Sequence, residues 1–363
     1  MTKVKDIYKY LDKLAPFNSA MDFDNCGLLV GDMEQDVRNV MISLDITKEV
    51  VKEASNNDIQ LIISHHPIIF KPLKYINSNS VPYMLANSEI SAICAHTNLD
   101  MADEGVNTCL ADALELNNIH PLSIYKKEYY NKIVVFAPKE YESIIIEKMS
   151  ENGAGELGDY SKCSFSSFGL GKYLCGKDSN PFIGKPNKYE ITDEIKIEMI
   201  CKKCDTKNVI SAMKSVHPYE EPAFDVFEDK AIRYNIPLGL VGRLDKAMNS
   251  KEFAYYVKDK LKCEGVRYTE QNEKINKVAV CSGAGGDLVK DAFKCGAEAF
   301  VTGEIKHNQI LEANDFNITV VDAGHFKTED VVIERLVKML SKKFSNVKFS
   351  KSLCFNDKIK YIS

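Results

Sequence analysis

Histidine is scarce in this chain, and its placement is the feature that says most about chemistry. Only seven His occur among 363 residues, and five of them follow segments predicted to be buried strands. Acidic side chains occur at the same places. The candidate residues are His65, His66, His96, Asp100, Glu304, His307, His325 and Glu329. Imidazole nitrogens and carboxylate oxygens together suit Zn, Fe, Mn or Ni, so we expect a metal site.

The first group of candidates lies in the N-terminal third of the chain. His65 and His66 follow a strand predicted at 61–64, and ligands of open α/β sheets bind beyond the carboxyl ends of strands. His96 and Asp100 hold the equivalent place after the next strand. His96 could be a ligand or an outer hydrogen-bond donor, and Asp100 could bridge two metals. The alternatives are surface His residues in a turn and an Asp that caps the helix expected near Glu104.

The second group lies near the end of the chain. His325 and Glu329 are four residues apart, a spacing that places two side chains on one helical face and also occurs in helical zinc motifs. Glu304 and His307 follow another predicted strand and could be outer partners or proton-transfer groups. The alternatives are a loop His, and Glu residues that favour the first turn of a helix.

Taken together, three His and two carboxylates fit a two-metal site. Two cations about 3.5–4 Å apart can activate a water molecule and hold a substrate oxygen. No Cys belongs to the group, which argues against an iron–sulfur centre or a structural zinc ribbon. The only CxxC, Cys201 to Cys204, has no second ligand pair at zinc spacing. The glycines from Gly283 to Gly286 form neither a P-loop nor a dinucleotide fingerprint.

The elements that must position these residues alternate between strand and helix. Apolar runs predict strands at 40–44, 61–64 and 92–95, and helices at 4–14, 48–55 and 81–87. The pattern returns after residue 237, with strands at 277–281, 299–301 and 318–321 and a last helix near 330–340. This alternation predicts an α/β fold with a largely parallel sheet.

The middle of the chain has a different rhythm. Residues 129–228 read as strand, helix, two strands, helix and strand, which predicts an inserted ferredoxin-like α+β domain. Polar stretches at 117–127 and 229–235 are expected to be its linkers. The core would then comprise 1–125 and 237–363. Within the insert, His217-Pro218-Tyr219-Glu220-Glu221-Pro222 could line a ligand cleft or form a rigid turn before a strand.

Composition sets the class of protein. Apolar residues make up 45% and charged residues 27%, as in soluble globular proteins, and the net charge is 47 − 52 = −5. This charge offers no basic excess for bulk nucleic-acid or anionic-membrane binding. No apolar run approaches the ~20 residues of a membrane span. The 11 Cys, an odd number, are expected to be reduced thiols, so we expect a cytoplasmic protein.

Several motifs resemble those of one known family, the GTP cyclohydrolase 1 type 2 homologs, also called NIF-three-like proteins. The likeness covers essentially the whole chain, and its inserted segment matches the long bacterial members. The matching core stretches are 24–31, Ser64-His65-His66-Pro67, 96–100, 302–307 and 324–329. In the insert they are Gly153-Ala154-Gly155, Gly169-Leu170-Gly171, 181–184 and 217–222.

The resemblance implies a split α/β core that holds two divalent metal ions per chain, interrupted by a PII-like or CutA-like domain. It also implies a toroidal homohexamer with its metal sites facing an inner cavity. The implied metal ligands are His65, His66, Asp100, His325 and Glu329, with Asp100 and Glu329 as bridges and His96 nearby. Small departures occur at Phe23, Cys26 and Glu304, and none removes a ligand.

Two functions follow as hypotheses. The first is a metal-dependent hydrolase that acts on a nucleotide or another phosphorylated small molecule, as a GTP cyclohydrolase would, with His96, Glu304 or His307 moving protons. The second is a non-enzymatic metal-binding hexameric scaffold or regulator whose insert senses a small ligand.

Overall fold

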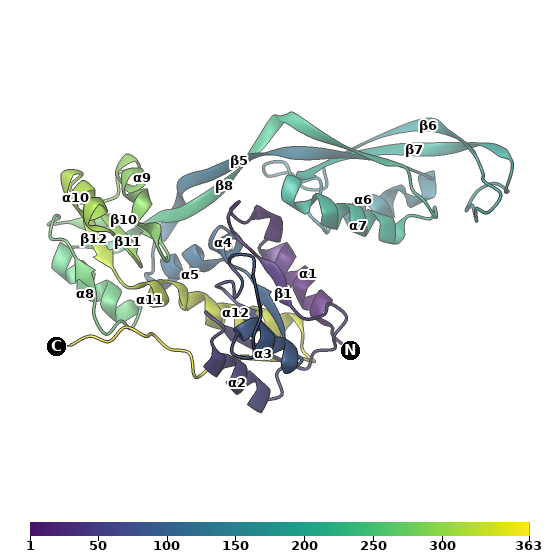
Figure 1. Ribbon diagram of the computed structural model, residues 1–363. Coiled ribbons are helices and arrows are strands. Elements are labelled where there is room, and N and C mark those ends of the chain that lie inside the picture. Colours follow the sequence, from purple (N-terminus) through teal and green to yellow (C-terminus); the bar gives the residue numbers. More distant parts are fainter. Residues whose placement is uncertain (363) are drawn as a thin grey trace. The chain divides into compact units, whose positions relative to one another are not determined.

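The computed structural model describes residues 1–362 of the chain. These residues divide into two compact units, one made of 1–125 with 237–363 and the other of 126–236 (Figure 1). The second unit is therefore inserted into the sequence of the first. Within the described part of the chain, no helix is both long enough and apolar enough to span a lipid bilayer.

The first unit contains a five-stranded sheet with the order β1-β4-β3-β2-β13. Strands β4, β3, β2 and β13 are parallel, and only β1 runs antiparallel, against β4. The strands are β1 (Gly27–Val30), β2 (Asn39–Ser43), β3 (Leu61–Ser64), β4 (Ser91–Cys94) and β13 (Lys348–Lys351). The predicted parallel strands at 40–44, 61–64 and 92–95 correspond to β2, β3 and β4.

Apolar side chains cover both faces of this sheet. Leu61 and Ile63 pack on one face with α1 (Val4–Leu14) and α12 (Val331–Lys343). Ile62 points to the other face, against α2 (Lys48–Asn56) and α3 (Val81–Asn87). Successive side chains of a strand face opposite sides, so a run of apolar residues is what a sheet buried on both faces requires.

A second group of parallel strands completes the first unit. These are β10 (Ile275–Cys281), β11 (Ala299–Thr302) and β12 (Thr319–Asp322), with the short β9 (Arg267–Tyr268) antiparallel at the edge. One face packs on α5 (Val106–Ala113) and α8 (Ser250–Lys260). The other packs on α9 (Val289–Lys294) and α10 (His307–Asp315).

The carboxyl ends of the two groups of strands meet in one place. Two short helices start there: α4 (Thr97–Asp100) after β4 and α11 (His325–Glu329) after β12. Asn107 of α5 joins the carboxyl ends of the two groups of strands. Its Nδ2 donates to Asp100 O at 2.9 Å, and its Oδ1 accepts from Ser282 N at 2.9 Å. The loops after β4 and β10 are thereby fixed against each other.

The second unit follows the order strand, helix, strand, strand, helix, strand. Its elements are the part of β5 (Asn117–Ala137) from residue 126 on, α6 (Glu142–Ser150), β6 (Ser164–Leu174), β7 (Tyr189–Lys202), α7 (Thr206–Val216) and the part of β8 (Phe224–Met248) up to residue 236. The strands are arranged as β6-β7-β5-β8. Ile133, Ile195 and Ile197 on the sheet pack against Met149 of α6 and Met213 of α7 to form a separate core.

The predicted linkers at 117–127 and 229–235 are wrong. Strand β5 runs unbroken from Asn117 to Ala137, and β8 runs from Phe224 to Met248. Lys, Asp and Asn in these stretches resemble a loop composition, but Ile124, Tyr125 and Tyr234 among them are good strand formers. A strand exposed on both faces needs no apolar alternation, because pairing with its neighbour satisfies its backbone.

Candidate metal centre

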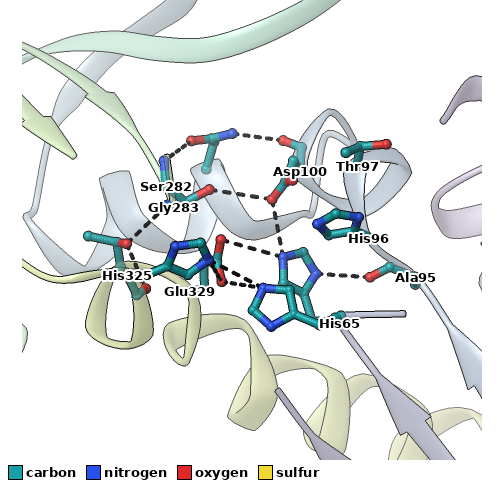
Figure 2. A network of polar contacts seen from close by, with 12 residues as sticks. His65, Ala95, His96, Thr97, Asp100, Ser282, Gly283, His325 and Glu329 are labelled. Atoms are coloured by element: carbon teal, nitrogen blue, oxygen red, sulfur yellow. Dashed lines mark hydrogen bonds and ion pairs between the residues drawn. The ribbon is translucent and has the colours of Figure 1, made fainter. Parts of the chain in front are cut away.

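Four imidazole rings gather where the strand ends meet (Figure 2). His65 and His66 follow β3, His96 follows β4, and His325 begins α11 after β12. The ring centroid of His66 lies 5.0 Å from that of His65, 5.5 Å from that of His96 and 5.3 Å from that of His325. Residues from both ends of the chain therefore line one small volume.

Each of these four rings is held through its Nδ1 atom. In every case Nδ1 lies within hydrogen-bond distance of an oxygen, so Nδ1 carries a proton and Nε2 is the nitrogen left to bind a metal ion once its own proton is released. The contacts are His65 with Ala95 O at 2.9 Å, His66 with Asp45 Oδ1 at 3.0 Å, His96 with Asp24 Oδ1 at 2.9 Å and His325 with Glu304 Oε1 at 2.7 Å. This is the arrangement found around metal-ligating histidines, where an outer oxygen fixes the ring and the tautomer.

The first candidate ligand group is His66, His325 and Glu329. The Oε2 atom of Glu329 lies 3.0 Å from each of the two Nε2 atoms, which are 3.3 Å from each other. Ligand atoms about 2.0–2.1 Å from a shared ion lie about 2.8–3.4 Å apart in octahedral or tetrahedral geometry. Glu329 Oε2 is buried and accepts no hydrogen bond from residues 1–362. A shared cation would satisfy all three atoms.

The second candidate group is His65, His66 and His96, whose ligand atoms lie within 4.8 Å of one another. His65 is buried, and its Nε2 lies 3.5 Å from Asp100 Oδ1 and 3.8 Å from Glu329 Oε1. That nitrogen has no hydrogen-bond partner in the part of the chain described. Buried polar atoms are almost always satisfied, so this pair of orphaned atoms indicates a ligand.

Glycine at position 283 makes room for the acidic ligand. Gly283 follows β10 with φ +57°, and a Cβ there would lie 2.2 Å from Glu329 Oε1. Its N–H donates to Thr328 Oγ1 at 3.1 Å, which ties this loop to α11. Any larger residue would meet the carboxylate and adopt an unfavourable backbone conformation.

The site is electrostatically suited to cations. Burial alone would raise the pKa of Glu329, but the adjacent His325 and His65 imidazoles hold that pKa well below its usual range. Burial is also the main reason that the pKa of Asp100 is raised, with the nearby Glu329 charge adding to it. The contact with Glu329 raises the pKa of His325 to about 9. For His66, burial lowers the pKa, but Asp45 and Glu329 outweigh it and raise it to about 10.

Two orienting carboxylates escape the sequence analysis. Asp24 is fully buried and accepts from His96 Nδ1 and from Thr97 N at 3.0 Å. Burial opposes its charge, yet these hydrogen bonds bring its pKa below the usual range, so it stays ionised. Asp45 lies two residues after β2, and the strand-end rule applied to that strand would have found it. Asp24 begins the stretch 24–31 that resembles the family, but nothing in the sequence alone assigns it to His96.

The structure brings some of the eight candidates predicted from sequence together and leaves others outside the site. The five proposed ligands lie together, and His96 joins the ligand group rather than standing apart as a proton-transfer residue. Glu304, with its side chain 61% exposed, contacts His325 from outside. His307 is exposed at the first residue of α10, and among residues 1–362 it takes no part in the hydrogen bonds of the site. Asp100 belongs to α4 and does not cap α5, which begins after Gly105.

A cavity of about 630 Å³ opens beside the histidines. Glu304 and His325 form part of its wall, and two cationic side chains, Arg267 and Lys306, line it with the ring of Tyr361. Arg267 forms an ion pair with Asp322 at the end of β12. Among the candidate ligands only His325 lines this cavity, which is large enough for a small-molecule ligand.

Comparisons with known proteins fit this description. The profile of the family described as Duf34/NIF3 (NGG1p interacting factor 3) matches residues 2–360. A Bacillus subtilis protein named GTP cyclohydrolase 1 type 2 homolog is 36% identical over 95% of this chain and 94% of its own. A Staphylococcus aureus protein of the same name is 37% identical over 96% and 95%.

Solved structures give the same result. The crystal structure of a Bacillus cereus protein related to NIF3 is 33% identical and superposes with a TM-score of 0.80 over 99% of both chains. Staphylococcus aureus protein SA1388 is also 33% identical, with a TM-score of 0.72 over 99% of both chains.

Proposed function

The chain belongs to the Duf34/NIF3 family, and we propose that it is a two-metal hydrolase of a nucleotide or another phosphorylated small molecule. The observation that carries the proposal is the convergence of four His Nε2 atoms and a buried Glu329 carboxylate, with every Nδ1 held by an oxygen. Four rings oriented in this way suit metal ligation better than any packing role, since packing does not require a buried nitrogen without a partner such as His65 Nε2.

The proposed ligand sets share residues. His66, His325 and Glu329 would hold one ion, and His65, His96 and Asp100 would hold a second, with Glu329 and Asp100 available to bridge. Mixed nitrogen and oxygen ligation suits Zn, Fe, Mn or Ni. Divalent cations at such a site supply Lewis acidity to a substrate oxygen and to water.

The cavity beside the centre supports the substrate class. Arg267 and Lys306 are the lining cations that would meet phosphate oxygens, beside the lining carboxylates Asp287, Glu304 and Asp322, and the ring of Tyr361 offers a face for a base or a similar flat group. Of the three residues predicted to move protons, Glu304 is the one that lines this cavity. Its Oε1 is 2.7 Å from His325 Nδ1, so it also orients a ligand. We assign proton transfer to Glu304 and not to His96 or His307.

The assembly and the insert are part of the proposal. The strand order β6-β7-β5-β8 and the order of elements support a ferredoxin-like, PII-type insert. Exposed apolar residues on its hairpin, Phe165, Tyr189 and Ile191, support self-association of the kind expected for a toroidal homohexamer. The molar mass measured by light scattering tests this, and a monomer at micromolar concentration would overturn it.

The test of the main proposal is elemental analysis followed by a substrate screen. Freshly purified protein should contain about two metal ions per chain. The metal-loaded protein should then hydrolyse at least one member of a panel of nucleotides, phosphoesters and cyclic amides. Asp100→Ala should lose turnover while keeping its assembly, and Asp103→Ala, an exposed neighbour, should retain it. Metal-free protein as purified, or no metal-dependent turnover in the panel, would refute the hydrolase.

A further inference from the structure

The second unit contains a cavity of its own, with a volume of about 800 Å³. One wall is the hairpin of β6 and β7, and another is the segment Tyr219, Glu220 and Glu221. This segment belongs to the Pro-bracketed motif at 217–222, which the proposed metal chemistry does not use. Ligand sites for small molecules typically occupy about 300–1,000 Å³, so the volume suits one.

A buried carboxylate lines this cavity. Glu194 of β7 is only 9% exposed, and its Oε1 accepts the Tyr219 hydroxyl at 2.8 Å. Gly171 on the paired strand makes space for it, since a Cβ there would lie 2.4 Å from Glu194 Oε2. Within residues 1–362 no cationic side chain forms an ion pair with Glu194, and the nearby Lys196 pairs instead with Glu198. A buried charge without a counterion costs free energy unless a ligand compensates it.

Aromatic rings form the other surfaces. The ring of Tyr219 lies 6.3 Å from that of Phe182 and 6.5 Å from that of Tyr173. Tyr173 is fixed because its hydroxyl donates to Ile183 O at 3.0 Å. The backbone N–H of Asn180 donates to Glu220 Oε2 at 3.1 Å, which holds the 219–221 segment against the opposite loop. The walls are therefore preformed, and they offer flat apolar faces.

The charges select the ligand. The lining carboxylates outnumber the lining lysines, so the cavity disfavours phosphate and other anions. The acidic residues are Asp178, Glu194, Glu220 and Glu221, and the basic ones are Lys172 and Lys196. A carboxylate beside aromatic faces suits a flat ring that carries N–H donors, because two adjacent N–H groups can pair with the two oxygens.

We propose that this cavity binds a planar nitrogen heterocycle whose adjacent N–H donors pair with Glu194 while its ring packs on Tyr219 and Phe182. The site lies wholly within the inserted unit and uses none of the residues of the metal centre. It stands or falls independently of the proposed hydrolase function. The ligand would be recognised by its amino-substituted ring and not by a phosphate.

Two matched pairs of probes test the proposal by calorimetry on the full-length, metal-loaded protein. Guanosine and 2-aminobenzimidazole carry the adjacent N–H pair, whereas inosine and benzimidazole lack the exocyclic amine. Loss of a hydrogen bond to a charged group should weaken binding at least about tenfold. We expect each amino compound to bind at least that much more tightly than its partner. Equal affinities within both pairs, or no binding of either amino compound at millimolar concentration, would overturn the proposal.

Variants test whether the ligand binds in this cavity. Glu194→Gln keeps the size of the side chain and removes the charge, so it should weaken the binding of 2-aminobenzimidazole at least about tenfold. Glu190→Gln, on the same strand but outside the cavity lining, should not. If Glu194→Gln unfolds, Phe182→Ala provides the test, because Phe182 is 51% exposed and its loss leaves the core intact. Binding that is unchanged in Phe182→Ala contradicts the assignment.

Discussion

The Nε2 atoms of His66 and His325, which are 259 residues apart in the chain, lie 3.3 Å from each other. Both also lie 3.0 Å from the same carboxylate oxygen of Glu329. Two imidazole lone pairs that face each other repel unless a proton or a metal ion lies between them. This relationship is what a metal ion held between the two rings would produce, and it can be tested residue by residue.

Removal of the charge of Glu329 should reduce the metal content. Glu329→Gln keeps the side-chain size but replaces a buried anionic ligand with a neutral amide, so about one ion per chain or fewer should remain. Mass spectrometry of the metals in purified protein measures this. Glu334→Gln, exposed on α12, is the control and should retain the full content. An unchanged content in Glu329→Gln would show that this carboxylate is not a ligand.

Asp24 should tune metal affinity without binding metal. Asp24→Asn removes the charge that orients His96 through its Nδ1, and changes of outer partners typically cost about 10–100-fold in affinity. Competition with a chromophoric chelator would measure the loss. The exposed Asp103→Asn serves for comparison. Equal affinities in the two variants would mean that the hydrogen bond from His96 to Asp24 does not matter for metal binding.

The stability of the metal-free protein should fall as pH rises, while the stabilisation added by metal should grow. The folded-state pKa values of His66, about 10, and His325, about 9, lie above the unfolded value of 6.5. Protonation of these rings therefore stabilises the metal-free fold fully below pH 6.5, and the contribution is lost as pH rises to about 10. Metal ions compete with those protons, so metal affinity should rise over the same range.

Thermal unfolding at pH 6.5 and pH 9.5 measures both effects. The Tm of the metal-free protein should fall between these values, and the increase in Tm on adding metal should become larger. If the added stability is the same at both values, proton release from these histidines does not accompany metal binding.

Gly283 should be intolerant of even a methyl group. Gly283→Ala meets Glu329 Oε1 at 2.2 Å and strains the backbone at φ +57°, and such strain alone costs about 1–3 kcal/mol. Gly158→Ala is a matched control, because Gly158 has φ +58° and nothing lies within 4 Å of the added atom. The unfolding free energy measured with denaturant and the metal content should both be lower in Gly283→Ala than in Gly158→Ala. If the two variants lose the same unfolding free energy, backbone strain alone explains the loss and the contact with Glu329 adds nothing.

The strands that carry the site could be predicted because each is a short apolar run buried on both faces. The prediction for α1, residues 4–14, agrees with the structure at both ends, since Val4, Ile7 and Leu11 repeat at helical spacing. The sequence also identifies the strand ends after which His65, His96 and His325 lie. Position on a parallel sheet therefore indicates the site before any side chain is placed.

Other parts could not be predicted, for physical reasons. Strand β13, with two Lys in four residues, is held by pairing with β2 and not by its own apolar pattern. The Nδ1 partner Asp24 comes from a loop whose shape follows no periodicity. The exposed strands β5 and β8 have the composition of linkers. They form because neighbouring strands satisfy their backbone hydrogen bonds, which needs no apolar pattern.

The link from His66 to His325 also has a consequence for the order of events during protein synthesis. The ion proposed on His66, His325 and Glu329 cannot have its full ligand set until the ribosome has passed residue 329, and the first sheet gains β13 only at residues 348–351. A nascent chain therefore lacks this ion while the insert is being made. Metal capture would then act as a late staple that joins the two ends of the sequence and restricts the unfolded chain.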